Sequence, residues 1–160
     1  MSNYRTIALT QGKFAIVDEE DYEYLIQWEW KCSGRYASRY VWDGKKVTHI
    51  LMHRIVANTP KGMRTDHINH DGFDNRKSNL RICTQSQNCH NKRSNKDKNK
   101  GASKYKGVYF SKLLNKWHVQ INIKGKNTHL GVFIEEEDAA IAYNVAAQLF
   151  FNEYAYLNNV

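Results

Sequence analysis

Residues 66–88 decide the fold of this 160-residue chain. They read Asp-His-Ile-Asn-His-Asp-Gly-Phe-Asp-Asn-Arg-Lys-Ser-Asn-Leu-Arg-Ile-Cys-Thr-Gln-Ser-Gln-Asn. The pattern predicts a strand at residues 64–67, a long polar loop, and a second strand at residues 80–83. Thr84 is then a suitable N-cap for a helix that carries Asn88. A metal ion can bind between such a hairpin and helix, with ligands from both.

The N-terminal part is expected to form short hairpins and short helices. Asp43-Gly44 is a strong signal for a two-residue turn between strands. Asp18 is a suitable N-cap, since acidic residues and apolar residues at helical spacing follow it. A short helix is expected to end before Pro60, the chain's only proline. The predicted strands cover residues 6–9, 14–17, 36–42 and 46–52, and the helices start after residue 18 and at residue 53.

The composition favours a polyanionic partner. The formal net charge is +8, and nucleic acid fits this charge better than a membrane does. No apolar run is long enough to span a bilayer, and the first residues lack the apolar segment of a signal peptide. Cys32, Cys83 and Cys89 form no CxxC pair, which argues against a disulfide framework and a thiolate zinc site. We therefore expect the protein in a reducing cytoplasm.

The C-terminal third differs from the rest of the chain in its charge and in its pattern of apolar residues. Residues 93–104 are rich in bases without apolar periodicity, which predicts a solvated basic linker. Three strands are expected beyond it, and the second alternates between apolar and polar residues. Residues 135–150 then predict a helix that packs on the apolar face of a three-stranded antiparallel sheet. The strands cover residues 105–110, 117–123 and 128–133, and the helix stripe contains Ala139, Tyr143, Ala146 and Phe150.

Four separated elements between residues 51 and 91 resemble the HNH endonucleases with the ββα-metal fold, especially the homing endonucleases of phages and group I introns. Their order in the chain makes the resemblance specific, because a lone Asp-His pair would carry no weight. The elements are Leu51-Met52-His53-Arg54, Asp66-His67-Ile68-Asn69, Asp74-Asn75-Arg76 and Ser78-Asn79-Leu80-Arg81.

The resemblance implies a role for each of four residues. His67 matches the general base, work suited to a neutral imidazole near pH 7. Asn79 matches the central Asn, whose carbonyl would accept Nδ1–H of His67 and leave Nε2 as the base. Asp66 matches the carboxylate metal ligand, and Asn88 matches the last motif position, which is His in many members and Asn in a homing subgroup. A ligand pair of oxygens only favours Mg²⁺ or Mn²⁺ over zinc.

Three alternatives stay open in this segment. His70, in a loop with Asp71-Gly72, is the second choice for the base. His90 and Asn91 lie two and three positions after Asn88, so a small shift in register would bring either one to the metal position. Asn75 is expected to cap a turn or loop rather than to bind metal.

Residues 105–158 resemble the DNA-binding domain of plant ethylene-response factors, the apetala type, which also occurs fused to HNH nucleases in phages. The resemblance rests on residues 105–108, 116–121, 129–133 and 138–147, and implies a sheet that lies in the major groove with the helix behind it. The plant family reads DNA with several arginines that these strands lack, so DNA contact is expected but the plant target sequence is not. The expected DNA contacts are Lys92, Arg93, Lys106, Tyr109, His118, Gln120, Asn122 and His129.

Together these expectations describe an α+β protein. A nuclease domain would occupy residues 1–92, with the ββα-metal motif at about 64–92 and hairpins before it, and the DNA-binding domain would occupy residues 105–160. The expected function is a metal-dependent endonuclease acting on double-stranded DNA, without an obligate protein partner, encoded by a phage or mobile element and acting in the host cytoplasm. The alternatives are a non-catalytic DNA-binding regulator with a decayed HNH core, and an RNA-binding or RNA-cleaving protein.

The N-terminal aromatic residues have two interpretations. They could pack the core of the nuclease domain, which we favour because large aromatic side chains mostly supply buried area. They could also form a surface that faces DNA. The residues are Trp28, Trp30, Tyr40 and Trp42.

Overall fold

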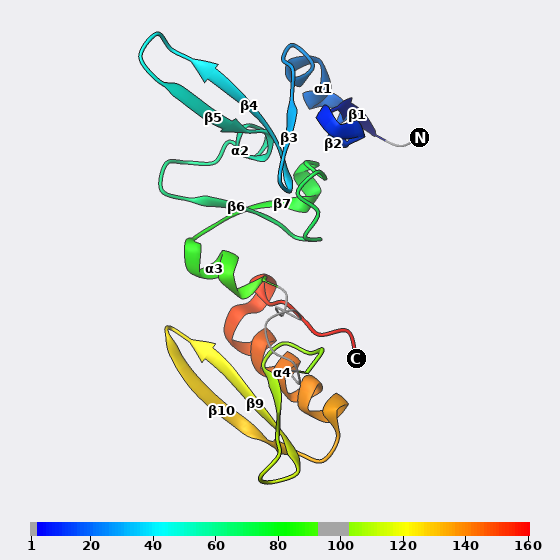
Figure 1. The fold of residues 1–160 in the computed structure, drawn as a ribbon, viewed down its shortest axis with the longest axis vertical. Helices are drawn as coiled ribbons and strands as arrows, with labels where there is room; N and C mark the ends of the chain where they lie inside the picture. Colours follow the sequence, from blue (N-terminus) through cyan, green and yellow to red (C-terminus); the bar gives the residue numbers. More distant parts are fainter. Residues whose placement is uncertain (1–2, 93–102) are drawn as a thin grey trace. The chain divides into compact units, whose positions relative to one another are not determined.

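The computed structural model describes residues 3–92 and 103–160. The chain divides into two compact units, Met1–Asn88 and Cys89–Val160, and each is described by itself (Figure 1). The basic linker expected at residues 93–104 lies almost entirely outside the described residues.

The first unit begins with a two-stranded antiparallel hairpin. β1 (Tyr4–Ala8) pairs with β2 (Phe14–Asp18), and α1 (Glu19–Leu25) follows at once. The first turn of α1 is acidic, which the helix dipole favours. Asp18 occupies the predicted N-cap position, but its Oδ2 accepts the distant backbone N–H of Lys77 at 2.7 Å and makes no capping bond. This bond ties the hairpin to the polar loop of residues 68–79.

A three-stranded antiparallel sheet comes next. The turn forms at the predicted place but is longer than two residues, since Trp42 pairs with Val47, and Asp43 Oδ1 accepts the backbone N–H groups of Lys45 and Lys46 at 2.9 and 2.8 Å. The first strand was not predicted, because three residues are too few to show a period of two. The strands, in spatial order, are β3 (Lys31–Ser33), β4 (Tyr36–Trp42) and β5 (Val47–Leu51), and α2 (Met52–Val56) follows them.

Two short strands and a helix then follow in the predicted order. β6 (Arg64–His67) and β7 (Leu80–Cys83) pair antiparallel, and α3 (Gln85–His90) begins directly after them. Thr84 Oγ1 accepts the backbone N–H of Gln87 at 3.2 Å, and Gln87 Oε1 accepts the backbone N–H of Thr84 at 2.8 Å. This reciprocal pair is a capping box, and it confirms Thr84 as the residue that starts the helix.

Buried apolar side chains from β1, β2, α1, α2 and β4 form the core of the first unit. Trp30 belongs to this core at 3% exposure, and its Nε1 donates to the Leu25 carbonyl at 2.8 Å. Tyr40 and Trp42 do not belong to it, because they are 56% and 63% exposed. The preference for core packing of the N-terminal aromatic residues is therefore confirmed for Trp30 and wrong for Tyr40 and Trp42.

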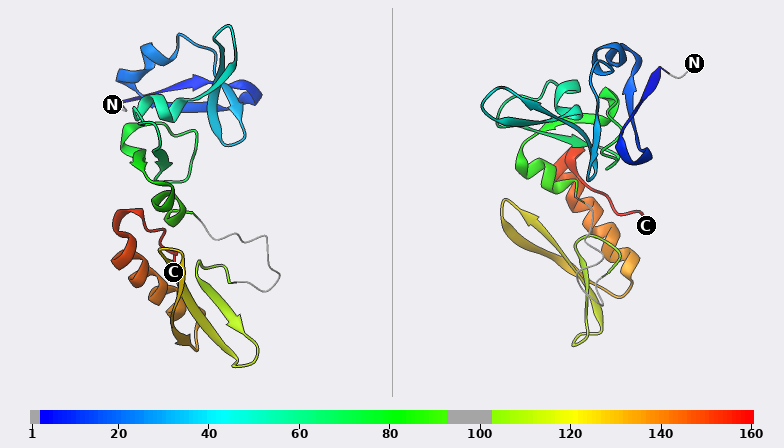
Figure 2. Two further views of the ribbon diagram at one scale, coloured as in Figure 1. Left: turned by 90° about the vertical axis from the view of Figure 1, so that its left-hand side faces the viewer. Right: turned by 45° about the horizontal axis from the view of Figure 1, so that its top comes forward.

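The second unit is a three-stranded antiparallel sheet with one long helix on one face (Figure 2). Val119 and Ile121 are buried against the helix, as the alternation predicted. Gly107 lets the chain pass close to Tyr143, since a Cβ at this glycine would lie 2.2 Å from that ring. The elements are β8 (Val108–Ser111), β9 (Lys116–Ile123), β10 (Lys126–Phe133) and α4 (Glu136–Phe151), and the strand order is β10-β9-β8.

The predicted stripe of α4 is wrong at its last position. Phe150 is 48% exposed, whereas Phe151 is buried with Ala147 and Tyr143. Residues 143, 147 and 151 are four apart, so they share one helix face, and this face rather than the neighbouring one meets the sheet.

Within residues 3–92 and 103–160, no helix has the length and apolar character needed to cross a membrane. The 3-10 turns are Thr10–Gly12, Lys77–Asn79 and Asn152–Tyr154.

Candidate functional site

The β6–β7 hairpin places Asp66 opposite Arg81. The Oδ2 atom of Asp66 accepts hydrogen bonds from Arg81 Nε at 2.9 Å and from Arg81 Nη2 at 2.6 Å. Both side chains are largely buried, with exposures of 8% and 14%. The sequence analysis did not foresee this ion pair, although cross-strand pairing of residues 66 and 81 follows from the hairpin register.

His67 is buried beside Asp66, and its environment favours the neutral imidazole. Burial lowers the pKa of His67, an effect that the contact with Asn75 and nearby carboxylates oppose. Nε2 of His67 lies 3.4 Å from Asn75 Oδ1, which is long for a hydrogen bond. Asn75 itself is fully buried, and its backbone N–H donates to the Ile16 carbonyl at 2.7 Å. A neutral, fixed imidazole of this kind is suited to accept a proton near pH 7.

Asn79 holds the loop that follows His67. Its Oδ1 accepts the backbone N–H of Asn69 at 2.9 Å, and its Nδ2 donates to the Asp74 carbonyl at 2.8 Å. The expectation was that the Asn79 carbonyl accepts Nδ1–H of His67. The bonds of Asn79 run to the loop backbone instead, and the amide that the structure places at Nε2 of His67 is that of Asn75.

Asp74 is the second anchor of this loop, at 2% exposure. Its carboxylate accepts hydrogen bonds from Arg76 Nε and Nη2 at 2.8 and 2.7 Å and from Asn69 Nδ2 at 2.9 Å. The bonds from Arg76 hold the pKa of Asp74 below its ordinary value. The Asn75 prediction is confirmed in part: its Nδ2 donates to the Phe73 carbonyl at 3.1 Å, a loop bond, and its Oδ1 also faces the candidate base.

Two further rings lie against His67. The His53 ring, on α2, lies 4.9 Å from the His67 ring at 85°, and the Tyr36 ring, on β4, stacks on it at 5.7 Å and 27°. Gly72 allows the loop to cross β4 here, since a Cβ would lie 2.0 Å from the Arg35 carbonyl oxygen and 2.7 Å from the Tyr36 ring. The sequence analysis quoted His53 within the HNH resemblance but gave it no role, and it missed Tyr36.

Asn88 lies on α3, one turn after the capping box. Its backbone N–H donates to the Thr84 carbonyl at 3.0 Å, and its side chain is half-buried. Asp66 and Asn88 offer only oxygen donors, a set that fits Mg²⁺ or Mn²⁺ better than zinc. The described residues contain no cluster of three or more His, Cys, Asp or Glu side chains that could hold a metal. Oδ2 of Asp66, the carboxylate expected to bind metal, is paired with Arg81.

In the second unit, three rings cross the open face of the sheet. Tyr109 stacks on His118 at 5.3 Å, and His118 lies 5.4 Å from His129. Gln120 is exposed in the same strand as His118. Asn122 is exposed too, but its side chain bonds to Asn127 Oδ1 at 2.7 Å and to the backbone N–H of Gly125 at 3.0 Å. Its amide therefore helps to hold the β9–β10 turn.

The three basic residues predicted to contact DNA differ in position. Lys106 is turned inward: its Nζ donates to the His90 carbonyl at 2.6 Å, and burial lowers its pKa to about 8. Lys92 is exposed, and Arg93 lies outside the described residues. His90, the alternative metal position, stacks on Phe151 at 3.7 Å, which indicates a packing role.

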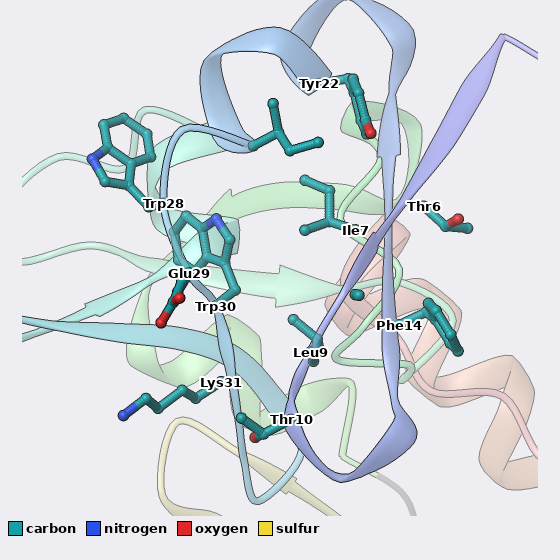
Figure 3. Close-up of a pocket in the computed structure, with 12 residues that line it drawn as sticks. Thr6, Ile7, Leu9, Thr10, Phe14, Tyr22, Trp28, Glu29, Trp30 and Lys31 are labelled. Carbon is teal, nitrogen blue, oxygen red and sulfur yellow. The ribbon is translucent and has the colours of Figure 1, made fainter.

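A separate groove of about 520 Å³ opens between β1 and residues 28–31 (Figure 3). Its walls are mostly apolar, and they include Ile7, Leu9, Phe14 and Trp30. None of the residues assigned to base or metal lines it. The candidate site is therefore the β6–β7 hairpin with its loop, together with α2 and β4.

The chain is similar along nearly its whole length to a viral protein. The chain is 29% identical over 153 residues to a protein of Acanthamoeba polyphaga mimivirus named as an uncharacterized HNH endonuclease. The similarity covers 94% of this chain and 77% of the viral protein. No protein-family model matches the chain.

Proposed function

We propose that this protein is a metal-dependent DNA endonuclease of the HNH type. The observation that carries the proposal is His67: a buried imidazole whose pKa is lowered, which lies against the rings of Tyr36 and His53 and follows Asp66 in the chain. The name of the mimiviral relative, which aligns with nearly the whole chain, supports the HNH endonuclease part of the proposal.

In this proposal His67 takes a proton from a water molecule as the water oxygen attacks the phosphorus of a phosphodiester. The bond from phosphorus to the 3′ oxygen breaks, and that oxygen leaves on the opposite side. Burial disfavours the imidazolium form before the reaction, so one ring nitrogen carries no proton and can act as a base near neutral pH. With Asn75 Oδ1 as the acceptor at Nε2, this nitrogen would be Nδ1 and not Nε2, which the resemblance had implied. Asn79 and Asp74 contribute by fixing the loop in which the base lies.

Asp66 and Asn88 would hold the divalent cation, Mg²⁺ or Mn²⁺. When bound, the cation supplies positive charge that stabilises the phosphorane and the departing oxygen. Arg81 and the cation would compete for the negative charge of Asp66, because Arg81 already bonds to this carboxylate.

Charge and exposed rings support duplex DNA as the substrate. The net charge of +8 suits a polyanion. On β4 and β5, Tyr40 stacks on His49 at 4.7 Å and Trp42 is 63% exposed, which supports the second interpretation of these aromatic residues, a surface that faces DNA. In the second unit the row of Tyr109, His118 and His129 offers a further contact surface. A homing role in a phage or mobile element, exercised in the host cytoplasm, belongs to the same proposal.

The test is cleavage of supercoiled plasmid by the full chain with Mg²⁺, with EDTA, and by the variant His67→Ala. The expected result is conversion to open-circle or linear DNA that requires both Mg²⁺ and His67. His70→Asn is the matched control, because position 70 has φ +66°, which Asn tolerates, and His70 was the second choice for the base. Two outcomes would contradict His67 as the base: cleavage by His67→Ala at the wild-type rate, or a loss of cleavage in His70→Asn but not in His67→Ala. Competition between duplex DNA and duplex RNA separates the two substrates.

A further inference from the structure

His53 is a buried histidine to which the proposed chemistry gives no task. It is 5% exposed, and its Nδ1 has no hydrogen-bond partner among the described residues. A buried polar group without a partner costs on the order of 1–3 kcal/mol, so Nδ1 does not stabilise the fold, and the ring itself is what His53 can contribute. Burial, followed by the charges of His67 and Arg54, lowers the pKa of His53 to about 3, so this ring is neutral.

Three rings touch one another at this place. His53 lies 4.9 Å from His67, Tyr36 lies 5.7 Å from His67, and Tyr36 lies 5.0 Å from His53. His53 is perpendicular to the His67 ring, whereas Tyr36 is nearly parallel to it. Asn75 adds a contact at Nε2. The imidazole of His67 is thus confined by three separate segments, α2, β4 and the loop.

We propose that His53 and Tyr36 are positioning residues that hold the imidazole of His67 in the orientation needed to take a proton. The inference rests on the proposed function, in which His67 is the base. A shift of about 1 Å in a reacting group can cost on the order of 10²-fold in rate. Because His53 is buried, it acts through His67 and not on the DNA. What it contributes is a flat ring of the right size.

The first experiment compares His53→Leu, His53→Phe and Tyr36→Leu with the control Met52→Leu, which changes a fully buried neighbour on α2. The single-turnover rate of plasmid cleavage, the Kd for duplex DNA in EDTA and the Tm are measured for the full chain. Both variants that lose a ring should cut at least about tenfold more slowly, with the Kd within about twofold of wild type. His53→Phe keeps a ring and should retain most of the rate, and Met52→Leu should cut as wild type does.

The second experiment does not need activity. Histidine-selective ¹⁵N spectra report the tautomer and exchange of the His67 ring. We expect the His67 signals to shift or broaden in His53→Leu and in Tyr36→Leu, and to stay in place in Met52→Leu.

Three results overturn the inference. One is a folded His53→Leu that cuts at the wild-type rate. Another is an equal loss of rate in the Leu and Phe variants that follows the loss of Tm, as a merely structural role would give. The third is unchanged His67 signals in both ring-loss variants. Tyr36 is 40% exposed, so Tyr36→Leu should fold, and it still tests the positioning of His67 if His53→Leu fails to fold. If the wild-type chain cuts no DNA, the proposed function fails, whereas the spectra still test the positioning.

Discussion

Replacing Asn75 with Ala removes a fully buried amide from the loop beside His67, and the structure gives the size of the effect. The bond from Nδ2 to the Phe73 carbonyl is lost, but that oxygen keeps the backbone N–H of Ile16 at 2.8 Å as a partner. The lost bond costs about 1 kcal/mol, and the long contact to His67 less than that. A small cavity adds about 0.5 kcal/mol. The free energy of unfolding of the first unit should therefore fall by about 2 kcal/mol.

For a domain of this size such a loss lowers the Tm by roughly 8–16 °C. Tryptophan fluorescence is a suitable signal, because Trp28, Trp30 and Trp42 belong to the first unit. Ser78→Ala, an exposed change in the same loop, is the matched control and should change stability by less than about 0.5 kcal/mol. An Asn75→Ala protein that melts within about 3 °C of wild type would refute the reasoning, since the amide would then carry no stability.

Three further predictions concern acid, metal and packing. Bonds from Arg76 lower the pKa of Asp74 in the folded chain. The stability that the Asp74 carboxylate contributes is therefore complete above its unfolded pKa and is lost as the pH falls through its folded pKa. In thermal melts below about pH 4, the Tm of Asp74→Asn should fall less with pH than that of wild type. Arg81→Met removes the guanidinium from Asp66, so the Tm without metal should fall. The rise in Tm on adding millimolar Mg²⁺ should be larger in this variant than in wild type. An equal rise in both proteins would count against Asp66 as a metal ligand. Gly107→Ala should lower the stability of the second unit by at least about 2 kcal/mol in chemical denaturation, because φ is +78° and the new Cβ would lie 2.6 Å from a backbone oxygen.

Local patterns in the sequence were enough to predict most elements of the fold. The alternation around Val119 and Ile121 gave the buried face of β9 correctly. Thr84 was a correct helix start because its capping box is complete within four residues. These features depend on neighbours in the chain, so the sequence contains the information directly.

The contacts at the base depend on the path of a long loop and could not be predicted in this way. Asn75 and Asn79 are equally polar, and no period distinguishes them. What brings Asn75 to His67 is its backbone bond to Ile16, a residue nearly sixty positions earlier. Lys106 was expected at DNA from the resemblance to the plant domain, yet its ammonium group bonds to the carbonyl of His90. Long-range contacts of this kind leave no local signal.

Gly72 restricts how this site can change in evolution. Its backbone is outside the left-handed region, so the restriction is steric: a Cβ would lie 2.0 Å from the carbonyl oxygen of Arg35. Because the obstacle is main chain, shortening Tyr36 would not relieve it. A saturation library should therefore lose every other amino acid at position 72, and lineages that alter the length of this loop should carry a compensating change in β4. The loop and the strand should therefore change together.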